Sequence, residues 1–268
     1  MGCSPAASVS YWKQKGQVGC PFLESRKSLD GGSAPWLNPM HSYSPTVRPK
    51  AIVTCGPGVA PVDSVRRITN YSTGELGVRL SEALAEYGWD VLCFKSSAAT
   101  FRDPVGAGVT VRYFATNEDL LQGLNAHSDK DDVCAVFQAA ALCDYEVESI
   151  CTTEGINLKE CAKISSEYPE LHILLKPAQK VLPHMKKLFR NARIVGWKFE
   201  MDGDRANSLV RGAKQIQENG CSLCVVNGAA YGAGFGILDS HGSCSWVATR
   251  SELCAWLTKW VGSLVVTL

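Results

Sequence analysis

The chain has 268 residues, of which 46% are hydrophobic and 20% charged, and its formal net charge is +1. This length and composition suit one large α/β domain, or two small ones, with a substantial core. The balanced charge excludes a global field that would draw the chain onto nucleic acid or a membrane, so an anionic ligand needs a local site. No stretch approaches the ~20 apolar residues of a membrane span, and the N-terminus lacks the apolar region of a signal peptide.

The 12 cysteines are scattered, and most lie in apolar runs such as Val91–Phe94, where cysteine behaves as a small hydrophobic residue. Disulfide frameworks belong to short secreted chains that lack a sufficient core. The one CxxC motif, Cys221–Cys224, has no second pair at the spacing of a zinc site, which leaves a redox motif or a core position. The apolar run that follows this motif favours the core position. We therefore expect a reducing, cytoplasmic location.

Residues 1–48 differ from the rest of the chain, because they combine Pro, Ser, Gly and isolated aromatics without periodicity. This composition is typical of a disordered segment. We expect a disordered N-terminal extension over residues 1–48 and an ordered domain over residues 49–268.

The first predicted strand is Ala51–Thr54, which ends in the turn Cys55–Gly58. Apolar residues at helical spacing predict a helix over residues 76–88 that stops at Gly88. Trp89–Phe94 is the next predicted strand. A right-handed crossover makes these two strands parallel neighbours.

The alternation of strands and helices continues along the chain. Asn117–Asn125 is predicted as a helix opened by an Asn cap, and the apolar run Val133–Ala141 is typical of a strand buried on both faces. Further strands are predicted over 110–114, 171–175, 193–197 and 222–226, and further helices over 179–191, 204–219 and 250–261. This order indicates a doubly wound, mostly parallel Rossmann-like α/β sheet with helices on both faces. Residues 145–170 break the pattern, and a loop of this length is often a binding flap.

Ligands of an open α/β sheet bind beyond the carboxyl ends of the strands, so candidate residues are expected directly after strands. Gly56 and Gly58 follow the first strand. Glycine allows main-chain N–H groups to approach phosphate oxygens closely. The alternative is a plain strand–helix turn.

A second candidate group precedes the first helix and consists of Arg66, Asn70, Ser72, Thr73 and Gly74. A helix N-terminus attracts anions through its unpaired N–H groups and its dipole. Arginine adds bidentate recognition of phosphate or carboxylate. The alternative is an ordinary capped helix with surface arginines.

Two more groups follow later strands. Ala140, Ala141 and Asp144 end the apolar strand, where small residues let a ligand lie against the main chain. Asp144 is suited to accept hydrogen bonds from a base or ribose, or to hold a metal; the alternative is a helix cap or loop aspartate. Lys163 and Lys176 are suited to neutralise phosphoryl oxygens, and the alternative for each is a solvated surface charge.

The segments that carry these residues resemble, in the same order, the phosphopantothenate–cysteine ligase family, especially its monofunctional form. They are VTCGPGVAPVDSVRRITNYSTGELG, AAALCDY, AKISS, LLKPAQKVL and VGWKFE, and the resemblance covers roughly residues 50–262. It implies a ligase that joins 4′-phosphopantothenate to cysteine through an acyl-nucleotide formed from CTP or ATP with Mg²⁺, in coenzyme A biosynthesis. It also implies a homodimer with a flap that closes over the site.

The resemblance assigns roles by position. Asn70 would hold the acyl-nucleotide, and Arg66 would contact the phosphopantothenate. Asp144 and its alanine neighbours would cradle the nucleotide. Lys163 would neutralise the triphosphate, and Lys176 would assist near the same site.

Three places depart from the family pattern. The glycine turn of the family is usually closer to SGGT, Trp197 stands where a Phe is common, and Cys143 occupies a place that is usually small or hydroxylic. These departures leave nucleotide preference and turnover open. By the resemblance, Trp197 would still belong to the nucleotide site, and Asn227, which matches the amide of an AND-type segment, would line the nucleotide pocket. Two rival classes remain: a flavin-binding or oxidoreductase Rossmann protein, although no dinucleotide fingerprint is present, and a non-catalytic nucleotide-binding relative.

Overall fold

The computed structural model describes residues 48–265, without the side chains of 264–265. The predicted disordered extension over residues 1–48 therefore lies outside the described residues, apart from Arg48. The predicted ordered domain over residues 49–268 is described as far as residue 265.

The central sheet has eight strands in the order β12-β11-β10-β9-β6-β1-β4-β5. The strands from β5 to β10 in this order run parallel, and β11 and β12 are antiparallel. The strand order reverses between β1 and β6, which confirms the predicted doubly wound sheet. The strands are β1 (Lys50–Cys55), β4 (Asp90–Ser96), β5 (Val109–Phe114), β6 (Val133–Gln138), β9 (Arg193–Phe199), β10 (Leu223–Asn227), β11 (Phe235–Asp239) and β12 (Cys244–Val247).

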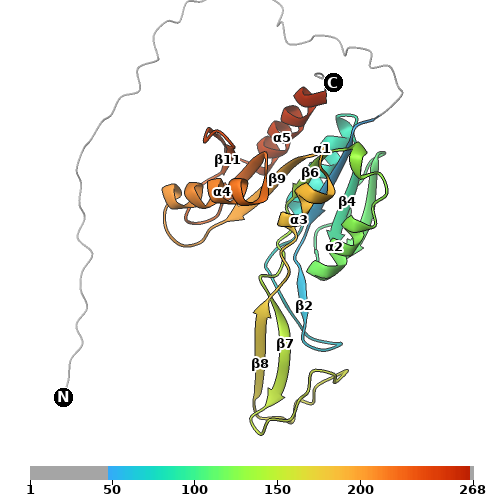
Figure 1. Ribbon diagram of the computed structural model, residues 1–268, viewed down its shortest axis with the longest axis vertical. Coiled ribbons are helices and arrows are strands. Elements are labelled where there is room, and N and C mark those ends of the chain that lie inside the picture. Colours follow the sequence, from blue (N-terminus) through green and yellow to red (C-terminus); the bar gives the residue numbers. More distant parts are fainter. Residues whose placement is uncertain (1–47, 266–268) are drawn as a thin grey trace, which may run out of the picture. The chain divides into compact units, whose positions relative to one another are not determined.

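Helices cover both faces of the sheet (Figure 1). One hydrophobic cluster joins the sheet to α1 and α5, through residues such as Leu84 and Leu257. A second cluster joins the opposite face to α2, α3 and α4, through residues such as Leu124, Met185 and Ile216. The helices are α1 (Glu75–Glu86), α2 (Asn117–Asn125), α3 (Leu182–Leu188), α4 (Arg205–Asn219) and α5 (Arg250–Val265), and one 3-10 turn spans η1 (Lys130–Asp132).

Capping residues explain where α2 and α4 begin and where α4 ends. Thr116, and not Asn117, caps α2: its hydroxyl accepts from the Asp119 N–H in a capping box. The predicted Asn cap is therefore wrong by one residue. Asp204 caps α4, which ends as predicted at Gly220 with φ +63°.

Two antiparallel ribbons lie outside the central sheet. One pairs β2 (Val59–Pro61) with β3 (Arg67–Thr69), and the other pairs β7 (Tyr145–Thr152) with β8 (Leu171–Pro177). Figure 1 shows the β7–β8 ribbon projecting beyond the sheet, with β2 beside it.

The β7–β8 ribbon corrects two expectations. Residues 145–170 were expected to be a loop, but β7 occupies the first part of that range. A register shift between Val147 and Ser149 interrupts the alternation by which a strand is recognised. The predicted strand over 171–175 exists, but it pairs with β7 and not with the parallel sheet. The segment also has a small core of its own, centred on the buried Ile150 and Ile164.

Other differences concern lengths and the C-terminal hairpin. Helix α3 covers Leu182–Leu188, with a proline in its first turn, and not the predicted residues 179–191. The predicted strand over Val133–Ala141 ends at Gln138. The hairpin of β11 and β12 was not expected from the sequence.

The described cysteines are free, and the CxxC motif belongs to the core. Burial raises the pKa of Cys221 to about 11 and the pKa of Cys224 to about 12. Both thiols therefore stay protonated near neutral pH, which does not suit a redox motif. Within the part of the chain that the structure describes, no helix is long and apolar enough to cross a membrane.

We predict that Gly77→Ala destabilises the protein. A Cβ at Gly77 would lie 2.3 Å from the Cys55 Cβ, where α1 packs on β1. Neither atom can move without its main chain, so we expect overpacking to cost about 1–3 kcal/mol in urea unfolding.

Gly262→Ala is the matched control. Its Cβ would meet the ring of Tyr87 at 2.5 Å, but that side chain is 59% exposed and can rotate away. We expect this variant to be neutral or more stable by up to about 1 kcal/mol. Equal effects of the two substitutions would contradict the packing account.

Candidate active site

Main-chain hydrogen bonds join the segments that leave β1 and β6. The Ala141 N–H donates to the Gly56 carbonyl at 2.9 Å, and the Gly58 N–H donates to the Ala141 carbonyl at 2.9 Å. Earlier along each segment, the Ala140 N–H donates to the side-chain hydroxyl of Thr54 at 3.2 Å. Two of the predicted candidate groups, the glycine turn and the alanines, therefore lie side by side at the point where strand order reverses.

The close approach of these segments explains the glycines. Gly56 has φ +88°, which disfavours any other residue. A Cβ on Gly58 would lie only 2.9 Å from the main-chain nitrogen of Cys143. The turn is therefore built to bring main chain against main chain.

Asn70, in the segment that follows β3, joins this junction through hydrogen bonds. Its Nδ2 donates to the Ala141 carbonyl at 3.0 Å and to the Leu142 carbonyl at 2.9 Å. Beside it, the Thr69 hydroxyl donates to the Gly58 carbonyl at 2.8 Å. Among the described residues, nothing donates to the Asn70 Oδ1, so this oxygen remains available to a ligand.

The N-terminus of α1 also meets the junction. Gly74 occupies the cap position with φ +83° and makes no side-chain cap. A Cβ on Gly74 would lie 3.4 Å from the Gly56 nitrogen. Thr73 accepts from the Glu75 N–H at 3.3 Å, and Ser72 is half-buried next to it. The predicted residues of this helix end are thus close to the glycine turn.

Arg66 and Lys163 lie near each other elsewhere, where the β2–β3 ribbon contacts the segment that follows β7. The Arg66 Nη2 donates to the carbonyl of Ile164 at 2.6 Å, next to Lys163. Both side chains are exposed. The structure therefore brings these two predicted cations into one neighbourhood, apart from the cavity described next.

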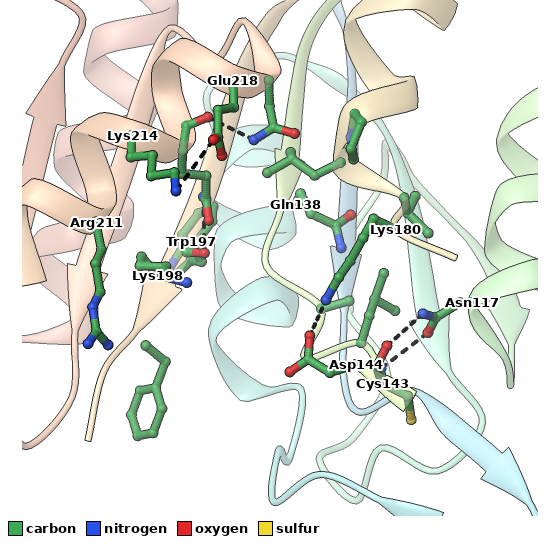
Figure 2. Close-up of a pocket in the computed structure, with 18 residues that line it drawn as sticks. Asn117, Gln138, Cys143, Asp144, Lys180, Trp197, Lys198, Arg211, Lys214 and Glu218 are labelled. Atoms are coloured by element: carbon green, nitrogen blue, oxygen red, sulfur yellow. Dashed lines mark hydrogen bonds and ion pairs between the residues drawn. The ribbon is translucent and has the colours of Figure 1, made fainter. Parts of the chain in front are cut away.

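A cavity of about 650 Å³ opens over the carboxyl ends of β6 and β9. It lies between α4 and the segments around α3 (Figure 2). Its lining residues are Asn117, Gln138, Ala140, Leu142, Cys143, Asp144, Lys180, Val181, Leu182, Pro183, Trp197, Lys198, Phe199, Arg211, Lys214, Gln215, Glu218 and Asn219. This volume is in the range of small-molecule and nucleotide sites.

Basic side chains stand on both sides of this cavity. Arg211 and Lys214 come from α4, whereas Lys180 reaches from the other side to Asp144 (Figure 2). Lys198 lies between them on β9, 3.3 Å from Glu200.

Carboxylates hold these cations in place. Glu200, which is 7% exposed, also pairs with Arg211, and Lys214 pairs with Glu218 at 3.6 Å. Four basic and two acidic side chains line the cavity, and with Glu200 beside it the cluster carries one net positive charge. The excess positive charge suits a polyanion such as a triphosphate.

The predicted site residues are divided between these places. Ala140 and Asp144 line the cavity, as does Trp197. The Trp197 side chain packs against the cluster shared by α1 and α5, while its carbonyl accepts from Gln215 at 3.2 Å. Asn227 ends β10, and its carbonyl accepts from the Glu200 N–H at 2.9 Å.

Lys176 lies on the ribbon and not in the cavity. It is opposite Glu146 in the β7–β8 register, and the two side chains are 3.3 Å apart. The prediction that Lys176 assists near the triphosphate finds no support in this geometry.

Several lining residues were not predicted. Arg211, Lys214 and Glu218 recur at helical spacing on one face of α4, a pattern that also describes an ordinary solvated face. Asn117 is 7% exposed, and its Nδ2 donates to the Cys143 carbonyl at 2.8 Å. Lys180 had a weak signal, since it follows Lys176 in one of the segments that resemble the family.

The comparisons with known proteins agree with this fold. The family model "DNA/pantothenate metabolism flavoprotein C-terminal domain" matches residues 47–259. The "Coenzyme A biosynthesis bifunctional protein CoaBC" of Mycobacterium bovis is 27% identical over 197 residues, covering 72% of this chain and 45% of that protein. The protein of the same name from Thermococcus kodakarensis is 29% identical over 66% of this chain and 41% of that protein. The chain thus spans about half the length of these relatives.

Solved structures show the same fold. The DNA/pantothenate metabolism flavoprotein from Streptococcus pneumoniae aligns with a TM-score of 0.70 at 23% identity, over 80% of this chain and 99% of that one. A Cab2 mutant in complex with phosphopantothenate-cysteine aligns with a TM-score of 0.61 at 14% identity, over 81% of this chain and 88% of that one. The chain belongs to the family of the DNA/pantothenate metabolism flavoprotein C-terminal domain.

Proposed function

We propose that this protein is a phosphopantothenate–cysteine ligase that acts in coenzyme A biosynthesis. The observation that carries the proposal is the cationic cavity next to the junction of β1 and β6, which is the expected ligand position of a doubly wound sheet. Family membership and the coenzyme A biosynthesis relatives support the same substrate class.

The reaction has two steps. A carboxylate oxygen of 4′-phosphopantothenate attacks the α-phosphorus of CTP or ATP, and pyrophosphate leaves. The product is an acyl-nucleotide. The amine of cysteine then attacks the acyl carbon, the nucleoside monophosphate leaves, and the amine loses a proton to give 4′-phosphopantothenoylcysteine.

The first step requires two anions to approach each other, and the basic side chains offset their repulsion. In the second step they stabilise the negative charge of the departing nucleoside monophosphate. In this proposal Lys198, Arg211 and Lys214 bind the triphosphate in the cavity, while Asp144 and Ala140 contact the nucleoside. Asn70 holds the acyl-nucleotide, with its Oδ1 as the group left free by the main-chain contacts.

The remaining predicted residues act around this centre. The glycine turn and Ser72–Gly74 supply main-chain N–H groups at the rim, and Asn227 supports the loop behind Glu200. Arg66 binds the phosphate or carboxylate of phosphopantothenate. Lys163, which the resemblance gave to the triphosphate, is assigned to the same substrate as Arg66, because it neighbours Ile164 and does not line the cavity. Lys176 is left out of the chemistry, because it is paired on the ribbon.

The resemblance implies Mg²⁺, and the residues present fit an ion that accompanies the nucleotide. Mg²⁺ on a triphosphate is held mainly by phosphate oxygens and water, with one or two carboxylates. Asp144 and Glu218 are the carboxylates that line the cavity. Within the described residues, no group of three or more potential metal ligands comes together, so the phosphates would supply most of the coordination. Bound there, the ion would neutralise phosphate charge.

We further propose a homodimer. Strand β8 exposes three consecutive apolar side chains, Ile173, Leu174 and Leu175, at 40%, 56% and 39%. Because side chains alternate along a strand, Ile173 and Leu175 lie on one face of the ribbon and Leu174 on the other. A two-stranded ribbon with exposed apolar side chains is a poor isolated structure and gains from covering by a second copy.

A pyrophosphate-release assay tests the proposed function. We expect release only when a nucleotide and 4′-phosphopantothenate are both present, and amide product only when cysteine is added. Comparing CTP with ATP identifies the nucleotide. Binding of nucleotide without pyrophosphate release in the complete mixture would favour the non-catalytic alternative.

Asn70→Asp should separate the two steps. The change replaces an amide that donates to two carbonyls with a carboxylate that repels them. We expect pyrophosphate release to persist and amide formation to fall by about a hundredfold, as when one preorganised contact to an intermediate is lost. Quantifying both products by chromatography checks this.

Asn125→Asp is the matched control, because Asn125 also donates to a main-chain carbonyl, that of Leu121 at 2.8 Å, but on α2. It should leave both products unchanged. Normal amide production by Asn70→Asp would refute the role given to Asn70.

Arg211→Gln should weaken nucleotide binding about tenfold, the loss of one charge-assisted contact. Folding should survive, since Glu200 keeps Lys198 as a partner. Isothermal titration with CTP and ATP measures the effect. Arg193→Gln is the control, because Arg193 begins β9 at the opposite end of the sheet. An equal loss in both variants would show that the cavity does not select the nucleotide.

A further inference from the structure

We propose that Asp63 is a positioning residue that fixes Arg66 and Lys163 as one two-cation site for an anionic group of the substrate. This inference rests on the proposed ligase function and deepens it. Asp63 itself touches no substrate in this proposal, and its role is to hold the groups that do.

The Asp63 carboxylate is fully buried by the groups that bind it, with a side-chain exposure of 0%. Its Oδ1 accepts from the main-chain N–H of Val65 at 2.9 Å and of Arg66 at 2.7 Å. Its Oδ2 accepts from Arg66 Nε at 3.0 Å and Nη2 at 2.5 Å, and from the Ile164 N–H at 3.1 Å. Both oxygens are thus occupied by donors from two separate segments of the chain.

These bonds leave one edge of the Arg66 guanidinium free. Nε and one N–H of Nη2 bind Asp63, and Nη2 also donates to the Ile164 carbonyl at 2.6 Å. Nη1 makes no hydrogen bond to any described residue. Its two N–H groups are therefore the ones that a phosphate or carboxylate can reach.

The same contacts fix the main chain on both sides of Lys163. The Ile164 N–H is bound by Asp63, and the preceding Ala162 carbonyl accepts from the Ser64 N–H at 3.0 Å. The Ile164 side chain is 1% exposed in the small core of the β7–β8 segment. Lys163 lies between two anchored neighbours and is itself exposed, so its main chain is held beside the segment of Arg66.

The charge of Asp63 persists at any practical assay pH. The Arg66 guanidinium and three N–H donors hold the pKa of Asp63 well below its usual range. A lowered folded-state pKa means that this stabilisation is present above the ordinary pKa of about 4 and is lost only as the pH falls below it. The effect of replacing Asp63 should therefore not change between pH 6 and 9.

Asp63→Asn distinguishes positioning from simple electrostatics. The variant removes a negative charge, so a site that worked by charge alone would bind an anion more tightly. If Asp63 acts by positioning, binding becomes weaker although the site is more positive. The sign of the change in KM for 4′-phosphopantothenate is thus the deciding observation.

The experiment measures KM and kcat for each substrate in wild-type, Asp63→Asn and Asp239→Asn proteins. Asp239 is the matched control, because it accepts from the main-chain N–H of His241 and Ser243 in the turn after β11. We expect Asp63→Asn to raise the KM for 4′-phosphopantothenate about tenfold. The KM for the nucleotide should stay within about twofold, and Asp239→Asn should match the wild type.

Hydrogen exchange supplies a readout that does not depend on activity. The Ile164 amide should exchange at least about tenfold faster in Asp63→Asn, because its acceptor is weakened. Unchanged exchange, or an unchanged or lower KM for 4′-phosphopantothenate, would overturn the proposal. If the wild-type protein has no ligase activity, the proposed function fails, while the exchange result still tests the contact.

A second variant, Arg66→Lys, tests the same contact in case Asp63→Asn does not fold. It keeps the charge but lacks the fork that reaches Asp63 and the Ile164 carbonyl together. We expect the same rise in KM and the same faster exchange of Ile164. Wild-type behaviour of this variant would also overturn the proposal.

Discussion

The site depends on the hydrogen bonds that join the turn after β1 to the segment after β6. Ala141 binds both Gly56 and Gly58, and Asn70 binds the carbonyl of Ala141 from a third segment. This junction lies where the strand order reverses, so the ends of the two strands diverge above it and leave room for a ligand. Because the main-chain groups satisfy one another, recognition falls mainly to side chains and to the few N–H groups at the rim. The same closeness explains why the turn requires glycine.

Buried or paired carboxylates organise the positive charge around this junction. Glu200 holds two cations of the cavity, Lys198 and Arg211, and Asp63 does the same for Arg66 and the segment of Lys163. Unanchored cations would repel one another and lose side-chain entropy when a ligand fixed them. Anchoring them in advance reduces both costs, so that a polyanion meets side chains already in place. The cavity and the site of Arg66 and Lys163 share one arrangement: a carboxylate, Glu200 or Asp63, orients basic groups without neutralising all of them.

Hydrophobic spacing and glycine positions in the sequence predicted the strands of the parallel sheet, the helices and two helix ends, which depend on neighbouring residues in the chain. The parallel core and the helix ends at Gly88 and Gly220 follow from hydrophobic spacing and glycine conformation. Strand β8 was located but placed in the wrong sheet, because an apolar run does not reveal its partner. Arg211 was missed, since a basic residue on a polar helix face has no signal until the fold sets it over a cavity. Trp197 lines the cavity, as the resemblance implied, but strand alternation turns part of its side chain toward α1 and α5.

In the proposed reaction the carboxylate of 4′-phosphopantothenate and the nucleotide, both anionic, are brought into contact and joined beside the junction of β1 and β6. The most direct measurement follows oxygen atoms: 4′-phosphopantothenate labelled with ¹⁸O in its carboxylate is incubated with nucleotide, cysteine and the protein. Attack of the carboxylate on the α-phosphorus predicts that one ¹⁸O atom appears in the released nucleoside monophosphate, detected by mass spectrometry. Label in phosphate or pyrophosphate, or amide product formed with unlabelled nucleoside monophosphate, would contradict the account.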